Sequence, residues 1–123
     1  MASLEIRERQ SGDVAIISLV GRLVPDQEDE VFRECIDRLI DRDIHRIVVD
    51  LHDVVLLDSG GIGVLVAKLH SLRKRGGDLR LAHLTPRTER LLAITHLLSV
   101  FMTFPTVDRA VQSFSVPAAG GSR

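Results

Sequence analysis

The feature that most constrains the fold is a short apolar run that stands between two segments of helical periodicity. Residues 46–51 read RIVVDL, a β-branched run of strand length without alternation of apolar and polar side chains. Such runs are typical of strands that a parallel sheet buries on both faces. Because parallel neighbours need crossover connections, the helical segments on either side predict βαβ units.

Both flanking segments show helical spacing. Before the run, apolar residues recur every three or four positions, at Val31, Phe32, Cys35, Ile36, Leu39 and Ile40. After the run, a second helix is expected from Ile62 to Arg75, where Gly76 and Gly77 would stop it.

The ends of the chain complete this pattern. At the N-terminus, the alternation of residues 4–9, the turn SGD and the β-branched run 14–20 predict a hairpin. Beyond the second helix, strands are expected at residues 78–82 and 100–104. Helices are expected behind the cap Thr85, with Leu91, Leu92 and Ile94 as apolar residues, and at residues 107–114. The sequence therefore predicts an α/β domain with a mixed sheet, an N-terminal hairpin, right-handed βαβ crossovers and about four helices.

Charge and cysteine content restrict the function. Sixteen basic and seventeen acidic residues give a net charge of −1, which favours neither nucleic acid nor an acidic membrane surface as a partner. The single cysteine, Cys35, excludes an intrachain disulfide and a multi-cysteine metal site, and we expect it to be a core thiol. No apolar run approaches the roughly 20 residues of a membrane span, so we expect a soluble protein of the cytoplasm.

The stretch LLDSGGIGVL, residues 56–65, raises the question of catalysis because it combines a serine with glycines. A dinucleotide loop would need a third glycine where Val66 stands, and the lysine of a P-loop is absent. A nucleophile elbow, G-x-S-x-G, would need a glycine at Leu57, two positions before Ser59. The histidines are scattered without metal-binding spacing. We therefore expect no enzyme, no metal and no cofactor.

Two roles stay open for the residues of this turn. Asp58 and Ser59 are candidates to cap the helix, since short polar side chains accept hydrogen bonds from its first free N–H groups, and Gly60 and Gly61 would allow a tight turn. The turn also lies beyond the carboxyl end of a strand, where α/β sheets meet ligands and partners. A serine there can carry a phosphate, because the helix N-terminus tolerates negative charge.

Residues 46–97 resemble a STAS domain, specifically that of the bacterial anti-sigma factor antagonists. The resemblance rests on the strand that ends in Asp50, the Asp-Ser-Gly-Gly turn at residues 58–61, the break Gly76-Gly77 and the pair Leu91-Leu92. In that family, the unphosphorylated antagonist binds an anti-sigma factor that is itself a serine kinase, and the sigma factor is released. The kinase phosphorylates the serine after the Asp, which abolishes binding, and a serine phosphatase restores it.

The resemblance implies that Ser59 is the phosphorylated residue and that Asp58, Ser59, Gly60 and Gly61 contact the partner. Two positions depart from the family pattern. Gly60 replaces a second serine, and Val24 replaces the Asp of the usual Gly-x-Leu-Asp after the second strand. In the family this Asp lies near the phosphorylation turn. Asp26 could take its place, and we include it among the expected partner-binding residues.

The expected organisation is one STAS domain over residues 1–115, followed by a disordered tail over residues 116–123. The expected function is that of an anti-sigma factor antagonist without catalysis of its own, whose partners are an anti-sigma factor serine kinase and a serine phosphatase. An alternative is a non-catalytic STAS scaffold subunit of a stress-sensing or lipid-transport complex. In that alternative, Ser59 would serve only as a helix cap.

Overall fold

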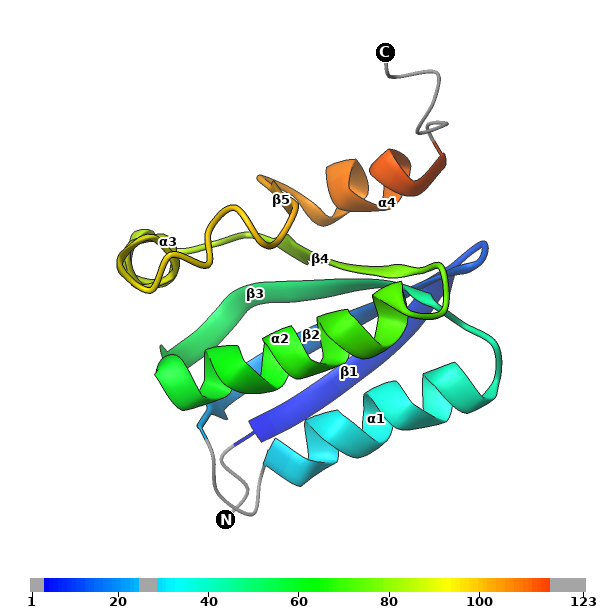
Figure 1. The fold of residues 1–123 in the computed structure, drawn as a ribbon, viewed down its shortest axis with the longest axis horizontal. Coiled ribbons are helices and arrows are strands. Elements are labelled where there is room, and N and C mark those ends of the chain that lie inside the picture. The colour runs from blue at the N-terminus through cyan, green and yellow to red at the C-terminus, as the bar shows by residue number, and fades with distance from the viewer. Residues whose placement is uncertain (1–3, 25–28, 116–123) are drawn as a thin grey trace.

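The computed structural model describes residues 4–24 and 29–115 (Figure 1). These residues form, in order, β1 (Leu4–Ser11), β2 (Val14–Leu23), α1 (Asp29–Asp41), β3 (Arg46–Leu57), α2 (Ser59–Arg73), β4 (Asp78–Ala82), α3 (Pro86–Ile94), β5 (Thr103–Phe104) and α4 (Val107–Ser115). The predicted alternation of strands and helices behind an N-terminal hairpin is confirmed, as are the four helices.

The described strands form one mixed sheet in the order β1-β2-β3-β4-β5. β1 pairs with β2 antiparallel, with Leu4 opposite Gly21 and Ser11 opposite Val14, as expected of a hairpin. The neighbours from β2 to β5 are parallel. Since α1 and α2 each connect two adjacent parallel strands, the predicted βαβ units are present.

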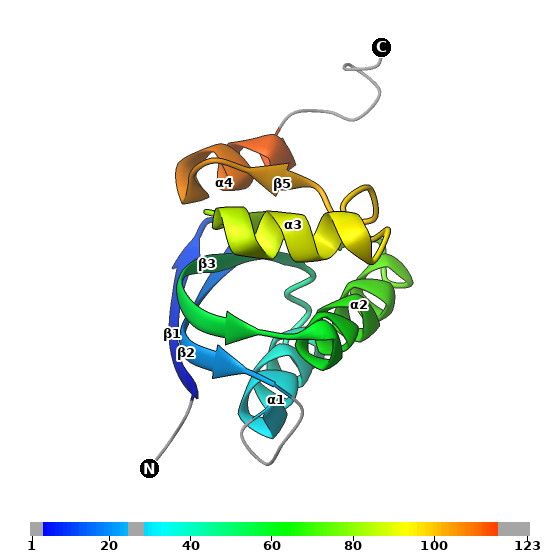
Figure 2. The same ribbon diagram turned by 90° about the vertical axis from the view of Figure 1, so that its left-hand side faces the viewer.

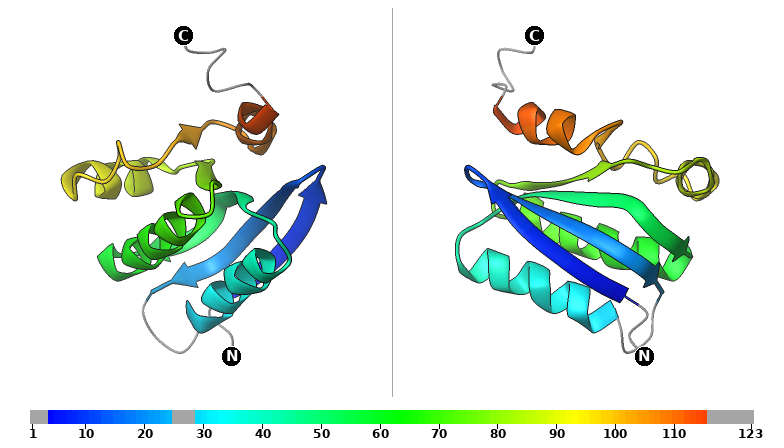
Figure 3. Two further views of the ribbon diagram at one scale, coloured as in Figure 1. Left: turned by 45° about the vertical axis from the view of Figure 1, so that its right-hand side comes forward. Right: turned by 180° about the vertical axis from the view of Figure 1, so that it is seen from behind.

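The helices form layers on both faces of this sheet. α1 and α2 lie side by side on one face, and α4 lies on the other (Figures 1 and 2). The larger core lies beneath α1 and α2 and includes Phe32, Ile36 and Leu65, whereas Val48 and Ala110 belong to a smaller core beneath α4. α3 lies at the end of the sheet where α2 begins (Figure 3). This arrangement brings α3 next to the turn between β3 and α2.

The central strand β3 is buried as its sequence predicts. Ile47 and Val49 point into the larger core and Val48 into the smaller one, and all three are fully buried. The strand is longer than the predicted segment 46–51, because its second half continues to pair with β2, up to Leu57 opposite Leu23. This extension passes the end of β4 and leads directly to Asp58.

Other boundaries also differ from the prediction. α2 begins at Ser59 rather than Ile62, because the glycines continue the helix instead of forming a separate turn, and it ends at Arg73. β5 contains only Thr103 and Phe104, since the segment before it forms turns, with the N–H of Val100 donating to Leu97. The predicted tail, residues 116–123, lies outside the described residues.

Candidate functional site

Asp58 caps α2 at the point where β3 ends. Its backbone is extended, with φ −110° and ψ −177°, and its Oδ1 accepts a 2.8 Å hydrogen bond from the N–H of Gly61. The N–H of Ile62 donates to the carbonyl oxygen of Asp58 at 3.0 Å. The first bond satisfies an N–H group that has no partner within the helix, and the second is the first regular backbone bond of α2. The predicted capping role of Asp58 is confirmed.

Ser59 is the first residue of α2, and its side chain is exposed. The prediction that Ser59 also caps the helix is wrong, because Asp58 already occupies the position before the first helical residue. Its hydroxyl is therefore accessible to another molecule. It also lies at the positive end of the helix dipole, where an added negative charge is stabilised.

Gly61 is required by close packing rather than by an unusual backbone conformation. The described glycines with positive φ are Gly12, Gly21 and Gly76. At Gly61, a Cβ atom would meet the carbonyl oxygen of Leu23 and the side chain of Leu57. The first turn of α2 is thereby held against the end of β2.

Ser59 lies in an open groove between the β3–α2 turn and α3. The groove, which we call the Ser59 groove, has a volume of about 540 Å³ and is lined by Leu56, Leu57, Asp58, Ser59, Arg87, Arg90, Leu91 and Ile94. This volume is comparable to that of a ligand pocket. The groove is not deep, so its walls are accessible to a protein surface.

Apolar and cationic side chains surround the serine. Of the groove-lining side chains, Ile94 is 68% exposed and Leu56 is 36% exposed. Arg87 and Arg90 are also exposed, and residues three apart on a helix project from the same face. Exposed apolar side chains beside arginines in one groove are typical of surfaces that bind another protein.

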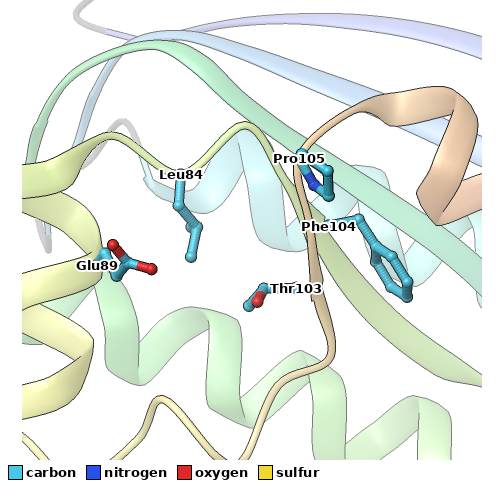
Figure 4. A pocket seen from close by; sticks show the side chains of 5 residues that line it. All are labelled: Leu84, Glu89, Thr103, Phe104 and Pro105. Atoms are coloured by element: carbon cyan, nitrogen blue, oxygen red, sulfur yellow. The ribbon is translucent and has the colours of Figure 1, made fainter.

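A second hollow lies between α3 and β5 (Figure 4). It has a volume of about 320 Å³ and is lined by Leu84, Glu89, Thr103, Phe104 and Pro105. The carboxylate of Glu89 points into this hollow, towards Leu84 and Thr103 (Figure 4). None of the described residues that the sequence singles out as functional lines it.

Asp50, which belongs to the family resemblance, lies in a polar cluster outside the Ser59 groove. Its Oδ1 is 2.9 Å from Nδ1 of His83 and accepts a 3.0 Å hydrogen bond from the N–H of His52. The two imidazole rings are in edge contact, with their centroids 5.4 Å apart. These contacts hold the end of β4 against β3, so Asp50 has a structural role in this arrangement.

Val24 stands where the family pattern has an aspartate, and the structure describes only some of the residues around it. Val24 is buried, with 9% of its surface exposed, and it follows Leu23, whose carbonyl oxygen faces Gly61. Asp26 lies outside the described residues, so its contact with a partner stays a prediction. A buried apolar side chain, rather than a charge, therefore follows the residue that contacts the start of α2.

Cys35 is a core thiol, as predicted. It is 2% exposed, and its Sγ lies 3.8 Å from Oε1 of Glu8. Burial, together with the nearby Glu8 carboxylate, raises the pKa of Cys35 to about 11. The thiol therefore stays protonated at neutral pH and is a poor nucleophile.

The sequence reasoning missed the wall of the groove that α3 contributes. Arg87, Arg90 and Ile94 follow one another at i, i+3 and i+7, which places them on one helix face. This spacing was visible in the sequence. What the sequence did not show is that this face stands opposite Ser59 instead of facing the core.

Residues 4–24 and 29–115 show neither a cluster of metal ligands nor a membrane-spanning helix. No group of three or more His, Cys, Asp or Glu side chains in these ranges could hold a metal ion. No helix in these ranges is both long enough and apolar enough to cross a membrane.

Comparison with known proteins gives consistent results. A curated relative, the anti-sigma F factor antagonist of Paenibacillus polymyxa, is 26% identical over 113 residues, which cover 92% of this chain and 94% of the relative. The crystal structure of an anti-sigma factor antagonist from Mycobacterium paratuberculosis superposes with a TM-score of 0.80 at 24% identity and covers 93% of this chain and 96% of that chain.

A second solved structure shares the fold at greater sequence distance. The Bacillus cell fate determinant SpoIIAA, in its phosphorylated form, has a TM-score of 0.70 at 19% identity, with 89% of this chain and 99% of that chain covered. The family model described as STAS domain matches residues 5–110. Since that match spans most of the chain and includes nearly all of β1, the Ser59 groove and the first turn of α4, the chain belongs to the STAS domain family.

Proposed function

We propose that this protein is an anti-sigma factor antagonist that binds an anti-sigma factor through the Ser59 groove while Ser59 is unphosphorylated. The observation that carries the proposal is the exposed Ser59 hydroxyl in a groove with apolar and cationic walls. Such walls suit a protein partner, because apolar contact supplies affinity and the arginines select acidic groups. The names of the relatives support the same role.

The proposed switch is phosphorylation of Ser59 by the anti-sigma factor, acting as a serine kinase. The Ser59 oxygen would attack the γ-phosphorus of ATP. A new O–P bond forms, the bond between that phosphorus and the bridging oxygen breaks, ADP leaves, and the hydroxyl proton passes to a base of the kinase or to water. A serine phosphatase would hydrolyse the phosphoserine. That a solved structural neighbour is in a phosphorylated form supports this scheme.

The phosphate would oppose binding without unfolding the protein. It adds a charge of about −1.5 to −2 at the N-terminus of α2, where the helix dipole tolerates it. A partner surface that accommodates a neutral hydroxyl would have to bury a strongly hydrated dianion, which costs several kcal/mol. Loss of affinity by about a hundredfold or more is expected, since ~1.4 kcal/mol corresponds to a factor of ten.

The protein itself would have no catalytic activity. Among the described residues that line the Ser59 groove there is no histidine to act as a base for the serine. The charged groups in the groove are the capping carboxylate of Asp58 and two arginines. These groups favour recognition over general-base activation of the hydroxyl.

The proposal is tested with the anti-sigma factor that co-purifies with the protein from its native cells. Binding to purified wild type, Ser59→Ala and Ser59→Asp is measured by titration calorimetry. We expect Ser59→Ala to bind as the unphosphorylated wild type does and Ser59→Asp to bind at least about tenfold more weakly. Ser99→Asp, at an exposed serine outside the groove, is the matched control. Equal affinities for all four proteins would contradict the proposal and favour the scaffold alternative.

A further inference from the structure

Two arginines stand across the groove from Ser59. Arg87 and Arg90 belong to α3, whereas Ser59 begins α2, and all three residues line the same groove. The ion pairs found among residues 4–24 and 29–115 use other arginines, namely Arg7, Arg33, Arg46, Arg73 and Arg80. Arg87 and Arg90 are therefore two exposed cations without an acidic partner within that part of the chain.

The acidic groups closest to these arginines in the sequence or in the groove form no ion pair with Arg87 or Arg90 among the described residues. Asp58 lines the groove, where its Oδ1 accepts the 2.8 Å hydrogen bond from the N–H of Gly61. Glu89, between the two arginines in sequence, directs its carboxylate into the hollow beside β5 (Figure 4). The α3 wall of the groove thus keeps a positive charge of two.

The shared groove lets the arginines turn toward a group on Ser59. All three residues line one space of about 540 Å³, and an arginine side chain is long and flexible. Arg87 and Arg90 are one helical turn apart, so both guanidinium groups approach from the same side. Guanidinium forks bind phosphate oxygens through paired hydrogen bonds.

We propose that Arg87 and Arg90 bind the phosphate of phosphorylated Ser59 within the same chain. This inference rests on the phosphorylation of Ser59 proposed above. The phosphate charge of about −1.5 to −2 would be matched by the two guanidinium groups. The bound phosphate would occupy the groove and remove the two cations from its surface. Phosphorylation would then close the binding surface from within, in addition to repelling the partner.

The test uses the full chain with phosphoserine incorporated at position 59 during translation, so that no kinase is needed. The second pKa of the phosphate is measured by ³¹P NMR titration in the wild-type background and in Arg87→Gln, Arg90→Gln and the double variant. Nearby cations favour the dianion and lower this pKa below its usual value of about 6. We expect the double variant to titrate higher than the wild type by about 0.5 pH unit or more, with the single variants between them.

Arg42→Gln is the matched control. This arginine is exposed just after α1 and does not line the groove, and its loss changes the net charge by the same amount as either single substitution. Arg42→Gln should titrate as the wild type does. Gln preserves helix propensity at the exposed positions 87 and 90, so these variants should keep the fold. Identical phosphate pKa values in the wild type and the double variant would overturn the inference.

A second measurement separates this inference from the proposed function. The ratio of the dissociation constants for the phosphorylated and unphosphorylated protein is determined with the anti-sigma factor, in the wild type and in the double variant. The inference predicts a smaller ratio in the double variant. If no anti-sigma factor binds at all, the proposed function fails, while the NMR titration still decides whether the arginines hold the phosphate.

Discussion

Asp58 and Gly61 close the first turn of α2 through a 2.8 Å hydrogen bond from the Gly61 N–H to the Asp58 carboxylate. The bond fixes the direction in which α2 leaves β3, and it leaves the hydroxyl of the intervening Ser59 exposed. The cap is thus the element that presents the proposed phosphorylation site.

Asp58→Ala should destabilise the protein by about 0.5–2 kcal/mol, the usual cost of losing a capping side chain. Asp58→Asn should retain most of the stability, because asparagine caps helices about as well as aspartate. Urea denaturation monitored by circular dichroism measures both free energies of unfolding. Equal losses in the two variants would show that the carboxylate charge, not the hydrogen bond, stabilises the turn.

Substitution by alanine should have opposite effects on stability at Gly61 and at Gly63, two glycines of α2. A Cβ at Gly61 meets the Leu23 carbonyl oxygen, which belongs to the sheet and cannot move away easily, so Gly61→Ala should cost roughly 1–3 kcal/mol. Gly63 is exposed, and a Cβ there meets no atom within 4 Å. Gly63→Ala should therefore stabilise the helix by about 0.5–1 kcal/mol. Thermal unfolding of both variants measures whether the two changes in stability have opposite signs. A loss of stability in Gly63→Ala would contradict this account.

Ile94 should contribute to partner binding without contributing to stability. It is 68% exposed in the Ser59 groove, so Ile94→Ser removes apolar surface that only a partner could bury. We expect a loss of affinity for the anti-sigma factor of about tenfold, which is within the range of interface truncations. Met102, which is 44% exposed and does not line the groove, supplies the control Met102→Ser. Equal effects of the two substitutions on calorimetric affinity would place the interface elsewhere.

Cys35 should make stability fall at high pH. Its pKa is raised from 9.0 to about 11 in the folded protein, chiefly by burial. In the unfolded chain the thiol loses its proton at lower pH than in the folded protein, so unfolding is favoured as pH rises from about 9 to about 11. Cys35→Ala lacks this titration. The difference in free energy of unfolding between the wild type and Cys35→Ala should therefore shrink over this range, and a constant difference would contradict the assignment.

The sequence predicts the fold because its elements carry strong local signals. The run RIVVDL is short, β-branched and apolar at successive positions, as is typical of a strand buried on both faces, and Thr85 with Pro86 marks the start of α3. The second half of β3 was missed, since Val55 and Leu56 are exposed and the pairing with β2 is irregular there, with Val54 opposite Gly21 and Leu56 opposite Arg22.

The sequence predicts only one of the two walls of the Ser59 groove. The turn from Asp58 to Gly61 is contiguous in the sequence, so its role follows from residue types and position. The opposite wall depends on how α3 packs against the β3–α2 turn, which is a tertiary relationship. Arg87 and Arg90 are ordinary surface residues in the sequence, and only the fold places them across from Ser59.

The two walls of the Ser59 groove differ in how they are buried in the protein core. The first turn of α2 rests on buried Gly61 and Ile62, within the main core, whereas α3 buries only Thr88 and Leu92. Substitutions on the outer face of α3 can therefore accumulate at little cost to folding. Among related proteins that share one cell, divergence along this helix would let each antagonist recognise its own anti-sigma factor while the serine and its cap stay unchanged.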